Sequence, residues 1–208
     1  MKRILCWLVL VGLLLAVGQA TPARGQEKNL LQSYVKRAVL AKYVIWDGKR
    51  FGGGGSWAQG GRCSVNSTEG HETKKSIEFH GEGGAWMGCG YNFFNWYPPE
   101  SKHDISSYEF LSFWIKVEAA PGKGPNGLTV ALNCSLTRKG SQTVQVADYC
   151  PEYADGQWHE VVIPLKHLNK DGFDVASTWE ISLGQWSQDT RNFSVYVTEI
   201  AADNRAKP

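Results

Sequence analysis

Aromatic rings, amides and glycines are concentrated in one uncharged stretch, 85–97. Its thirteen residues include six aromatic residues, two glycines and two asparagines, and none is charged. At the period of two of a β-strand, Met87, Cys89, Tyr91 and Phe93 fall on one face, and Trp86, Gly88, Gly90 and Asn92 on the other. The first set is typical of a core. The second set lacks the Lys and Glu of a solvated face and offers a flat ring beside accessible backbone.

Three later stretches continue this second face. In each, apolar residues alternate with small or neutral polar ones. The neutral sets are Thr129, Ala131, Asn133 and Ser135; Thr143, Gln145, Ala147 and Tyr149; and Ser182, Gly184 and Trp186. We therefore expect one sheet face without any charge, whereas a solvated face would carry several Lys or Glu.

Such a face suits a sugar. The apolar C–H patches of a pyranose ring lie on indole or phenol rings, and its hydroxyls bond to neutral amides. The predicted ligand-binding residues are Trp86, Asn92, Asn133, Gln145, Tyr149 and Trp186, with Trp57 presented by a glycine-rich loop at 51–61. The alternative is that loops cover Trp86 and Trp186, which would make the face a buried aromatic layer.

Catalytic chemistry is not indicated. A glycosidase needs two carboxylates roughly 5–10 Å apart across a cleft. The glutamates are scattered one to a strand, and we expect none on the neutral face; they are Glu78, Glu109, Glu118, Glu160, Glu180 and Glu199. His80 and His159 are isolated, and the sequence contains no nucleophile motif. The sequence therefore predicts a protein that is not an enzyme.

The elements that position this face are almost all strands. Turn residues recur every 8–15 residues, which predicts an all-β fold of two packed antiparallel sheets. The expected strands are 42–46, 76–80, 86–92, 108–118, 128–138, 142–149, 158–168, 178–186 and 192–203. Apolar residues at helical spacing predict one short N-terminal helix at 29–41.

The first 20 residues resemble an export signal. Lys2 and Arg3 precede an apolar run from residue 4 to 17, and small residues follow as far as Ala20. We expect cleavage after Ala20 and a secreted, periplasmic or cell-envelope location; the alternative is an uncleaved anchor. Without Lys2 and Arg3 the 22 basic residues fall to 20, against 20 acidic ones. A neutral chain predicts neither nucleic acid nor membrane as a partner after cleavage.

Four cysteines remain after Cys6 is removed with the signal. An even number in an exported chain favours disulfides, and four cysteines allow three pairings. Cys89 and Cys134 share parity with core residues, which favours their pairing and leaves Cys63 with Cys150. The alternative is four buried free thiols.

Two segments resemble a known fold family. They are Tyr108-Glu-Phe-Leu-Ser-Phe-Trp-Ile-Lys-Val117 and Asp155-Gly-Gln-Trp-His-Glu-Val-Val-Ile-Pro-Leu165, followed by an acidic end of the last strand at Asp203. The pattern resembles the galactose-binding-like jelly roll, whose relatives include family 11 and family 30 carbohydrate-binding modules and the complex I intermediate-associated family. The resemblance covers residues 42–203, between a leader at 21–41 and a tail at 204–208.

The resemblance implies a jelly-roll sandwich with a concave face that binds a polysaccharide or oligosaccharide without catalysis. It also implies a structural calcium near the first and last strands, for which Asp47 and Asp203 are the candidate ligands; no other cofactor is expected. The complex I intermediate-associated relatives imply an alternative, a structural or assembly protein whose aromatic face binds a protein partner.

Overall fold

The structure is a computed structural model that describes residues 42–48, 54–82, 86–94, 102–119, 125, 127–134, 139–186 and 191–204. All of them belong to the compact unit Leu40–Pro208. The expected signal peptide and the helix at 29–41 lie outside the described residues. Within the described part of the chain, no helix has the length and apolar character needed to cross a membrane.

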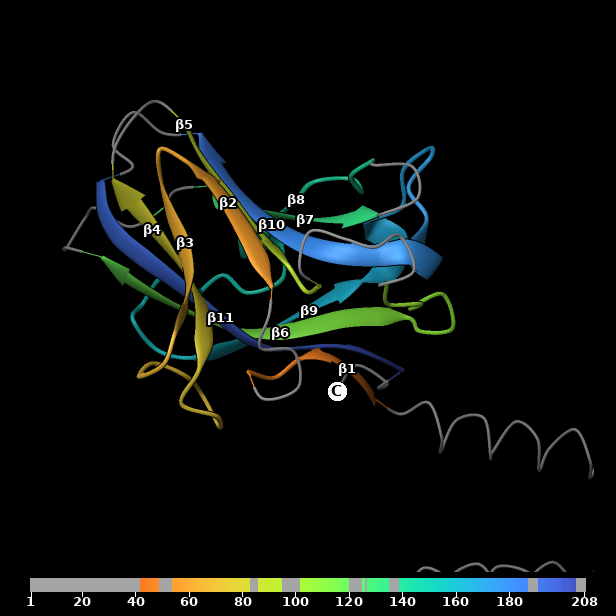
Figure 1. Cartoon of the computed structure of the whole chain (residues 1–208), viewed down its shortest axis with the longest axis horizontal. Helices are drawn as coiled ribbons and strands as arrows, with labels where there is room; N and C mark the ends of the chain where they lie inside the picture. The colour runs from red at the N-terminus through yellow and green to blue at the C-terminus, as the bar shows by residue number, and fades with distance from the viewer. Residues whose placement is uncertain are drawn as a thin grey trace, which may run out of the picture. The chain divides into compact units, whose positions relative to one another are not determined.

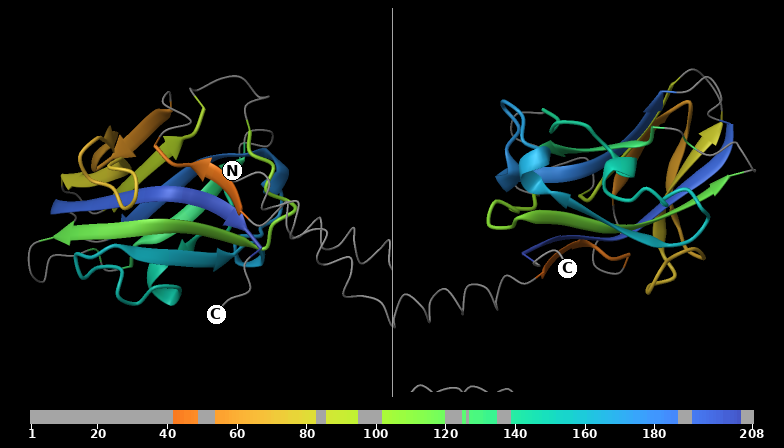
Figure 2. Two further views of the ribbon diagram at one scale, coloured as in Figure 1. Left: turned by 90° about the horizontal axis from the view of Figure 1, so that it is seen from below. Right: turned by 180° about the vertical axis from the view of Figure 1, so that it is seen from behind.

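The larger of two antiparallel sheets, sheet A, has six strands (Figure 1). Their bounds are β1 (Lys42–Trp46), β3 (Gly61–Asn66), β4 (Ser76–Glu82), β6 (Phe110–Ala119), β9 (His159–Pro164) and β11 (Arg191–Asp203). The order is β3-β4-β11-β6-β9, and β1 pairs with the end of β11. Figure 2 (left) shows β11, in blue, between β4 and β6. The last strand is thus the centre of this sheet.

The second sheet, sheet B, has five strands in the order β2-β5-β10-β7-β8. Their bounds are β2 (Gly55–Gln59), β5 (Trp86–Asn92), β7 (Thr129–Cys134), β8 (Val144–Gln145) and β10 (Thr178–Trp186). Three short 3-10 helices lie in the connections: η1 (Val146–Asp148), η2 (Leu165–His167) and η3 (Val175–Ser177). The predicted all-β sandwich of two antiparallel sheets is confirmed.

The core lies between the sheets because each strand buries alternate residues. In β7, Val130, Leu132 and Cys134 are buried while the residues between them are only half-buried. From sheet A, Phe79 of β4 and Ile115 of β6 are fully buried. The period of two seen in the sequence therefore identified the inward side correctly.

Three segments differ from the sequence-based expectation. The predicted strand at 158–168 is too long, because β9 ends at Pro164 and η2 follows. The predicted loop at 51–61 contains β2 and the first residue of β3, joined at Gly60 with a φ of 68°. Its many glycines have a low strand propensity, which hid these strands. The predicted strand at 142–149 is also too long, because β8 ends at Gln145 and η1 follows.

Loss of core volume should cost far more stability than loss of surface volume. Ile115→Ala removes a fully buried side chain from the central part of sheet A. We expect it to lower the free energy of unfolding by about 2–5 kcal/mol. Val65→Ala, at a side chain that is 45% exposed, should change it by less than about 0.5 kcal/mol. Urea unfolding measures both, and equal losses would contradict this core.

Candidate functional site

The strand register places the neutral residues on the outer face of sheet B. One row across the sheet is Trp57, Gly90, Ser182 and Ala131, and the next is Gln59, Gly88, Gly184, Thr129 and Gln145. Core residues such as Met87 and Leu183 point the other way. The five strands span about 19 Å. The predicted outward side of β5, β7 and β10 is therefore confirmed, and Trp57 joins it from β2 rather than from a loop.

Two indoles lie close to the backbone of β5. A Cβ atom added to Gly90 would collide with Nε1 of Trp57, and one added to Gly88 would collide with the six-membered ring of Trp86. Both tryptophans are only half-buried. Glycine at these two positions is what allows the rings to approach the backbone so closely while they remain partly accessible to solvent.

A carboxylate also lies on this face, so the expectation of an uncharged face is wrong. Glu180 pairs across the sheet with Asn92 of β5 and Asn133 of β7. Its carboxylate accepts hydrogen bonds from the side chains of Asn133 and Trp57. In the sequence, Glu180 lies two residues before Ser182 on the same strand. The alternation that assigns Ser182 to the outer face therefore assigns Glu180 to it as well.

Burial governs the ionisation of this carboxylate. Glu180 is only 4% exposed. Desolvation raises its pKa above the usual 4.5, while the bonds from Trp57 and Asn133 act in the opposite direction. A carboxylate held in this way positions the indole and the amide that it contacts.

Apart from Glu180, the described polar groups around the indoles are neutral. Oγ1 of Thr129 donates to the carbonyl oxygen of Gly184 at 2.9 Å, which leaves its lone pairs free to accept. Oγ of Ser182 donates to the carbonyl oxygen of Ala131 at 3.4 Å. Gln145, as predicted for this face, is exposed.

Two predicted ligand-binding residues are placed differently, and a third, Trp186, stays a prediction. Asn92 is fully buried, and its Oδ1 accepts the N–H of Phe94 at 2.8 Å, so it shapes a turn instead of meeting a ligand. Tyr149 follows η1, and its hydroxyl lies 2.9 Å from Nδ1 of His167, so the strand parity that assigned it to the face does not apply. Trp186 pairs with Trp86 through the backbone, and its side chain lies outside the described part of the chain.

The predicted calcium ligands cannot share an ion. Lys42 pairs with Asp203 at one end of β1, whereas Asp47 follows the other end, about 16 Å away. Calcium binds its oxygen ligands at 2.3–2.6 Å, which brings any two of them within about 5 Å. In addition, Asp203 is fully buried and accepts a hydrogen bond from Oγ of Ser112 at 3.0 Å.

The expected disulfide pairings, Cys89 with Cys134 and Cys63 with Cys150, are also wrong, because neither pair lies close enough to bond. Cys89 and Cys134 lie on β5 and β7, which β10 separates by about 9.5 Å. Cys63 and Cys150 lie at opposite edges of the sandwich, on β3 and after η1. A disulfide needs Cα atoms 4.4–6.8 Å apart.

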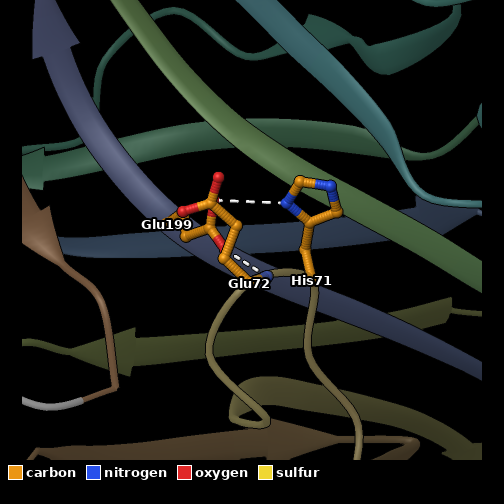
Figure 3. Close-up of side chains that lie close together, drawn as sticks. All are labelled: His71, Glu72 and Glu199. Atoms are coloured by element: carbon orange, nitrogen blue, oxygen red, sulfur yellow. Dashed lines mark hydrogen bonds and ion pairs between the residues drawn. The ribbon is translucent and has the colours of Figure 1, made fainter.

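A His-Glu-Glu cluster lies on the other sheet (Figure 3). His71, Glu72 and Glu199 offer ligand atoms within 4.8 Å of one another. Glu199 Oε2 lies 3.3 Å from His71 Nδ1, and Oε1 accepts the N–H of Glu72 at 2.8 Å. The His71 ring stacks on Trp114 at 3.6 Å. These contacts account for the cluster as the anchor of the β3–β4 loop on a bulge of β11, where Glu199 has a φ of 53°.

A serine, a histidine and a glutamate also meet on sheet A, in the wrong order for catalysis. Oγ of Ser194 donates to Glu78 at 3.1 Å and lies 2.9 Å from Nδ1 of His80. In a catalytic triad the histidine lies between the serine and the acid. Here the serine is in the middle, so the carboxylate of Glu78 does not orient the imidazole of His80 as the acid of a triad does.

Comparisons with known proteins agree with this geometry. The family model described as "Carbohydrate binding domain 30" matches residues 42–204. No curated protein sequence matches this chain.

Several solved structures share the fold. The family 30 carbohydrate-binding module of cellulosomal cellulase Cel9D-Cel44B of Clostridium thermocellum has a TM-score of 0.60 at 19% identity, over 81% of this chain and 100% of that one. A family 11 module from the same organism, in complex with a β-1,3-1,4-mixed-linked tetrasaccharide, has a TM-score of 0.54 at 14% identity, over 81% and 99%. A β-1,2-glucanase from Parabacteroides distasonis has 0.60 at 12%, over 81% of this chain and 26% of the enzyme.

The buried carboxylate should make stability depend on pH. As pH rises above 4.5, the unfolded chain loses the Glu180 proton first, because burial raises the pKa only in the folded protein. The free energy of unfolding should therefore fall as pH rises toward the folded pKa, by at most about 1.4 kcal/mol per pH unit. Glu180→Gln removes the titrating group. Its free energy of unfolding relative to that of the wild type should therefore increase as pH rises from 4.5 toward the folded pKa of Glu180.

Urea unfolding from pH 4 to 7 measures the difference between the two proteins. Glu109→Gln, at an exposed position, is the matched control and should run parallel to wild type. If the free energy of unfolding of Glu180→Gln changed with pH in the same way as that of the wild type, this result would contradict a raised pKa of Glu180.

Proposed function

We propose that this chain, which belongs to the carbohydrate binding domain 30 family and is a non-catalytic carbohydrate-binding module, holds a β-glucan along the outer face of sheet B. The observation that carries the proposal is the pair of indoles, Trp57 and Trp86, that lie in close contact with Gly90 and Gly88. An aromatic ring that lies on a sheet and stays partly accessible to solvent can contact the C–H face of a pyranose.

The polar groups complete a sugar-binding surface. Asn133, Thr129 and Gln145 lie across the sheet from the indoles and offer amide and hydroxyl groups to sugar hydroxyls. Because Glu180 bonds to both Trp57 and Asn133, it fixes an apolar and a polar contact relative to each other. Preorganised contacts of this kind lower the entropy cost of binding.

The ligand class follows from the relatives. The family 11 module was solved with a mixed-linked β-glucan tetrasaccharide, and the family 30 module belongs to a cellulase. An unbranched β-glucan is an extended chain, and the face of sheet B is long enough, at about 19 Å, for several sugar units. We therefore infer a β-1,4- or mixed-linkage glucan.

Removal of either indole should weaken glucan binding. We expect Trp57→Ala and Trp86→Ala each to reduce affinity at least about 10-fold, or about 1.4 kcal/mol. Isothermal titration of the protein with soluble β-1,4- and mixed-linkage glucans measures the change, and circular dichroism checks the fold.

Trp114→Ala is the matched control, because Trp114 points outward from sheet A, where it stacks on His71. Its affinity should equal that of the wild type. If Trp114→Ala is the variant that loses affinity for glucan, the binding site lies on sheet A and the proposal is wrong. If no glucan binds the wild type, the ligand class is wrong, and the aromatic face would then be tested against protein partners from the host envelope.

We also propose that the chain is exported. The support is the basic start, the apolar run at 4–17 and the small residues before Ala20. Polysaccharides of this class are extracellular substrates, which makes a location beyond the membrane consistent with the proposed ligand.

Export should leave a protein that begins at Thr21. When the chain is expressed with residues 1–20, N-terminal sequencing of the extracytoplasmic fraction should read Thr21-Pro-Ala. A chain that keeps Met1 in the membrane fraction would instead indicate an uncleaved anchor.

A further inference from the structure

Two thiols lie at the edge of the sandwich where the chain passes from one sheet to the other. β2 pairs with β5 in sheet B, the chain turns at Gly60, and β3 pairs with β4 in sheet A. Cys63 on β3 is paired with the buried Phe79, between the exposed Arg62 and Ser64. Its side chain therefore points into the space between the sheets.

Cys89 reaches the same space from sheet B. It is fully buried on β5, opposite Ala58 of β2. Its Sγ lies 3.9 Å from the carbonyl oxygen of Arg62, the residue before Cys63. A trans peptide holds the next Cα about 2.8 Å from that oxygen, so the Cα of Cys63 lies within about 6.7 Å of the Cys89 sulfur. Rotation of the two side chains and a modest approach of β3 to β5 would bring the sulfurs together.

We propose that Cys63 and Cys89 are a disulfide pair, which ties β3 to β5 when the chain folds in the presence of a small disulfide such as oxidised glutathione. The bond would close a loop that contains the β3–β4 hairpin and would fix the edge where β2 presents Trp57. It would also hold β5 directly between Gly88 and Gly90, on which the two indoles lie.

The chemistry balances as two thiol–disulfide exchanges. The thiolate of one cysteine attacks a sulfur of oxidised glutathione, forms a mixed disulfide and releases one glutathione thiolate. The second cysteine thiolate attacks the protein sulfur of that mixed disulfide and releases the other. Both protein thiols lose their protons, two electrons pass to glutathione, and two molecules of reduced glutathione leave.

The folded protein should oxidise slowly. Burial raises the pKa of Cys89 to about 12, and it raises the pKa of Cys63 even further, with an added contribution from the neighbouring Cys89. Exchange proceeds through the thiolate, which is scarce at neutral pH for such thiols. The bond should therefore form during folding, before β2 pairs with β5 and the two thiols are buried.

The other two cysteines provide an internal control. Cys134 is the last residue of β7. Cys150 donates its N–H to Val146, which in turn donates to Leu128 before the first residue of β7. The two thiols are thus separated by about the length of that strand, roughly 20 Å. They should stay reduced under the same conditions.

The test is a peptide map of the full chain, with Cys6→Ser throughout to remove the fifth thiol. The chain is unfolded with reductant, refolded in a glutathione redox buffer, alkylated and digested with trypsin. We expect peptides 63–74 and 76–102 to be linked, with a mass about 2 Da below the sum of the two reduced peptides. Peptides carrying Cys134 and Cys150 should be alkylated.

Thermal unfolding gives an independent readout. Reductant should lower the melting temperature of the oxidised protein by roughly 5–10 °C. It should have no such effect on Cys63→Ser or Cys89→Ser, whereas the double variant Cys134→Ser/Cys150→Ser should keep both the link and the shift.

Alkylation of all four cysteines after oxidative refolding would overturn the proposal, and so would a link between any other pair. The wild-type peptide map decides even if a serine variant does not fold. Neither readout involves glucan, so the proposal can fail while carbohydrate binding stands.

Discussion

The two glycines of β5 are the constraint on which the candidate face depends. A strand gives alternate residues to its two sides, so the residues between buried Met87, Cys89 and Tyr91 must face outward. At Gly88 and Gly90 the missing Cβ leaves the backbone open, and the indoles of Trp86 and Trp57 occupy that space. Any larger residue would lift a ring off the sheet. One strand thus provides core residues on its inner side and the base of the aromatic platform on its outer side.

Much of this arrangement could be predicted, because burial on one side fixes parity. The apolar residues of β5, β7 and β10 identified the inward face, and the outward residues followed. Parity fails where a strand ends. Because β8 stops at Gln145, the alternation of strand residues does not predict the side on which Tyr149 lies. The glycines around β2 lower its strand propensity, so the sequence does not predict this strand. The disulfide and calcium predictions depend on which strands are neighbours, and the alternation within a strand gives no information on that order.

Glu180 shows how a binding face can carry a stability cost. A buried carboxylate loses hydration, and the raised pKa measures the part of that loss that Trp57 and Asn133 do not offset. Glutamine at this position would avoid the desolvation but offers one acceptor oxygen where the carboxylate offers two. We interpret the retained charge as the means of holding an indole donor and an amide donor at once. Preorganisation of the face and stability of the fold are here in opposition.

The two outer faces of the sandwich differ in the charged groups that they carry. On sheet A, Lys116 is paired with Glu69 and Glu118 at 3.1 and 2.6 Å, and Glu78 accepts from Asn66 and Ser194. Charged groups of this kind bind water strongly and are costly to cover with a neutral ligand. On sheet B the one described carboxylate is buried beneath its donors, and the groups left at the surface are indoles, amides, hydroxyls and glycine backbone. A neutral polyhydroxylated chain would replace the water on this second face at little electrostatic cost, whereas the charged groups of the first face would make the same replacement costly.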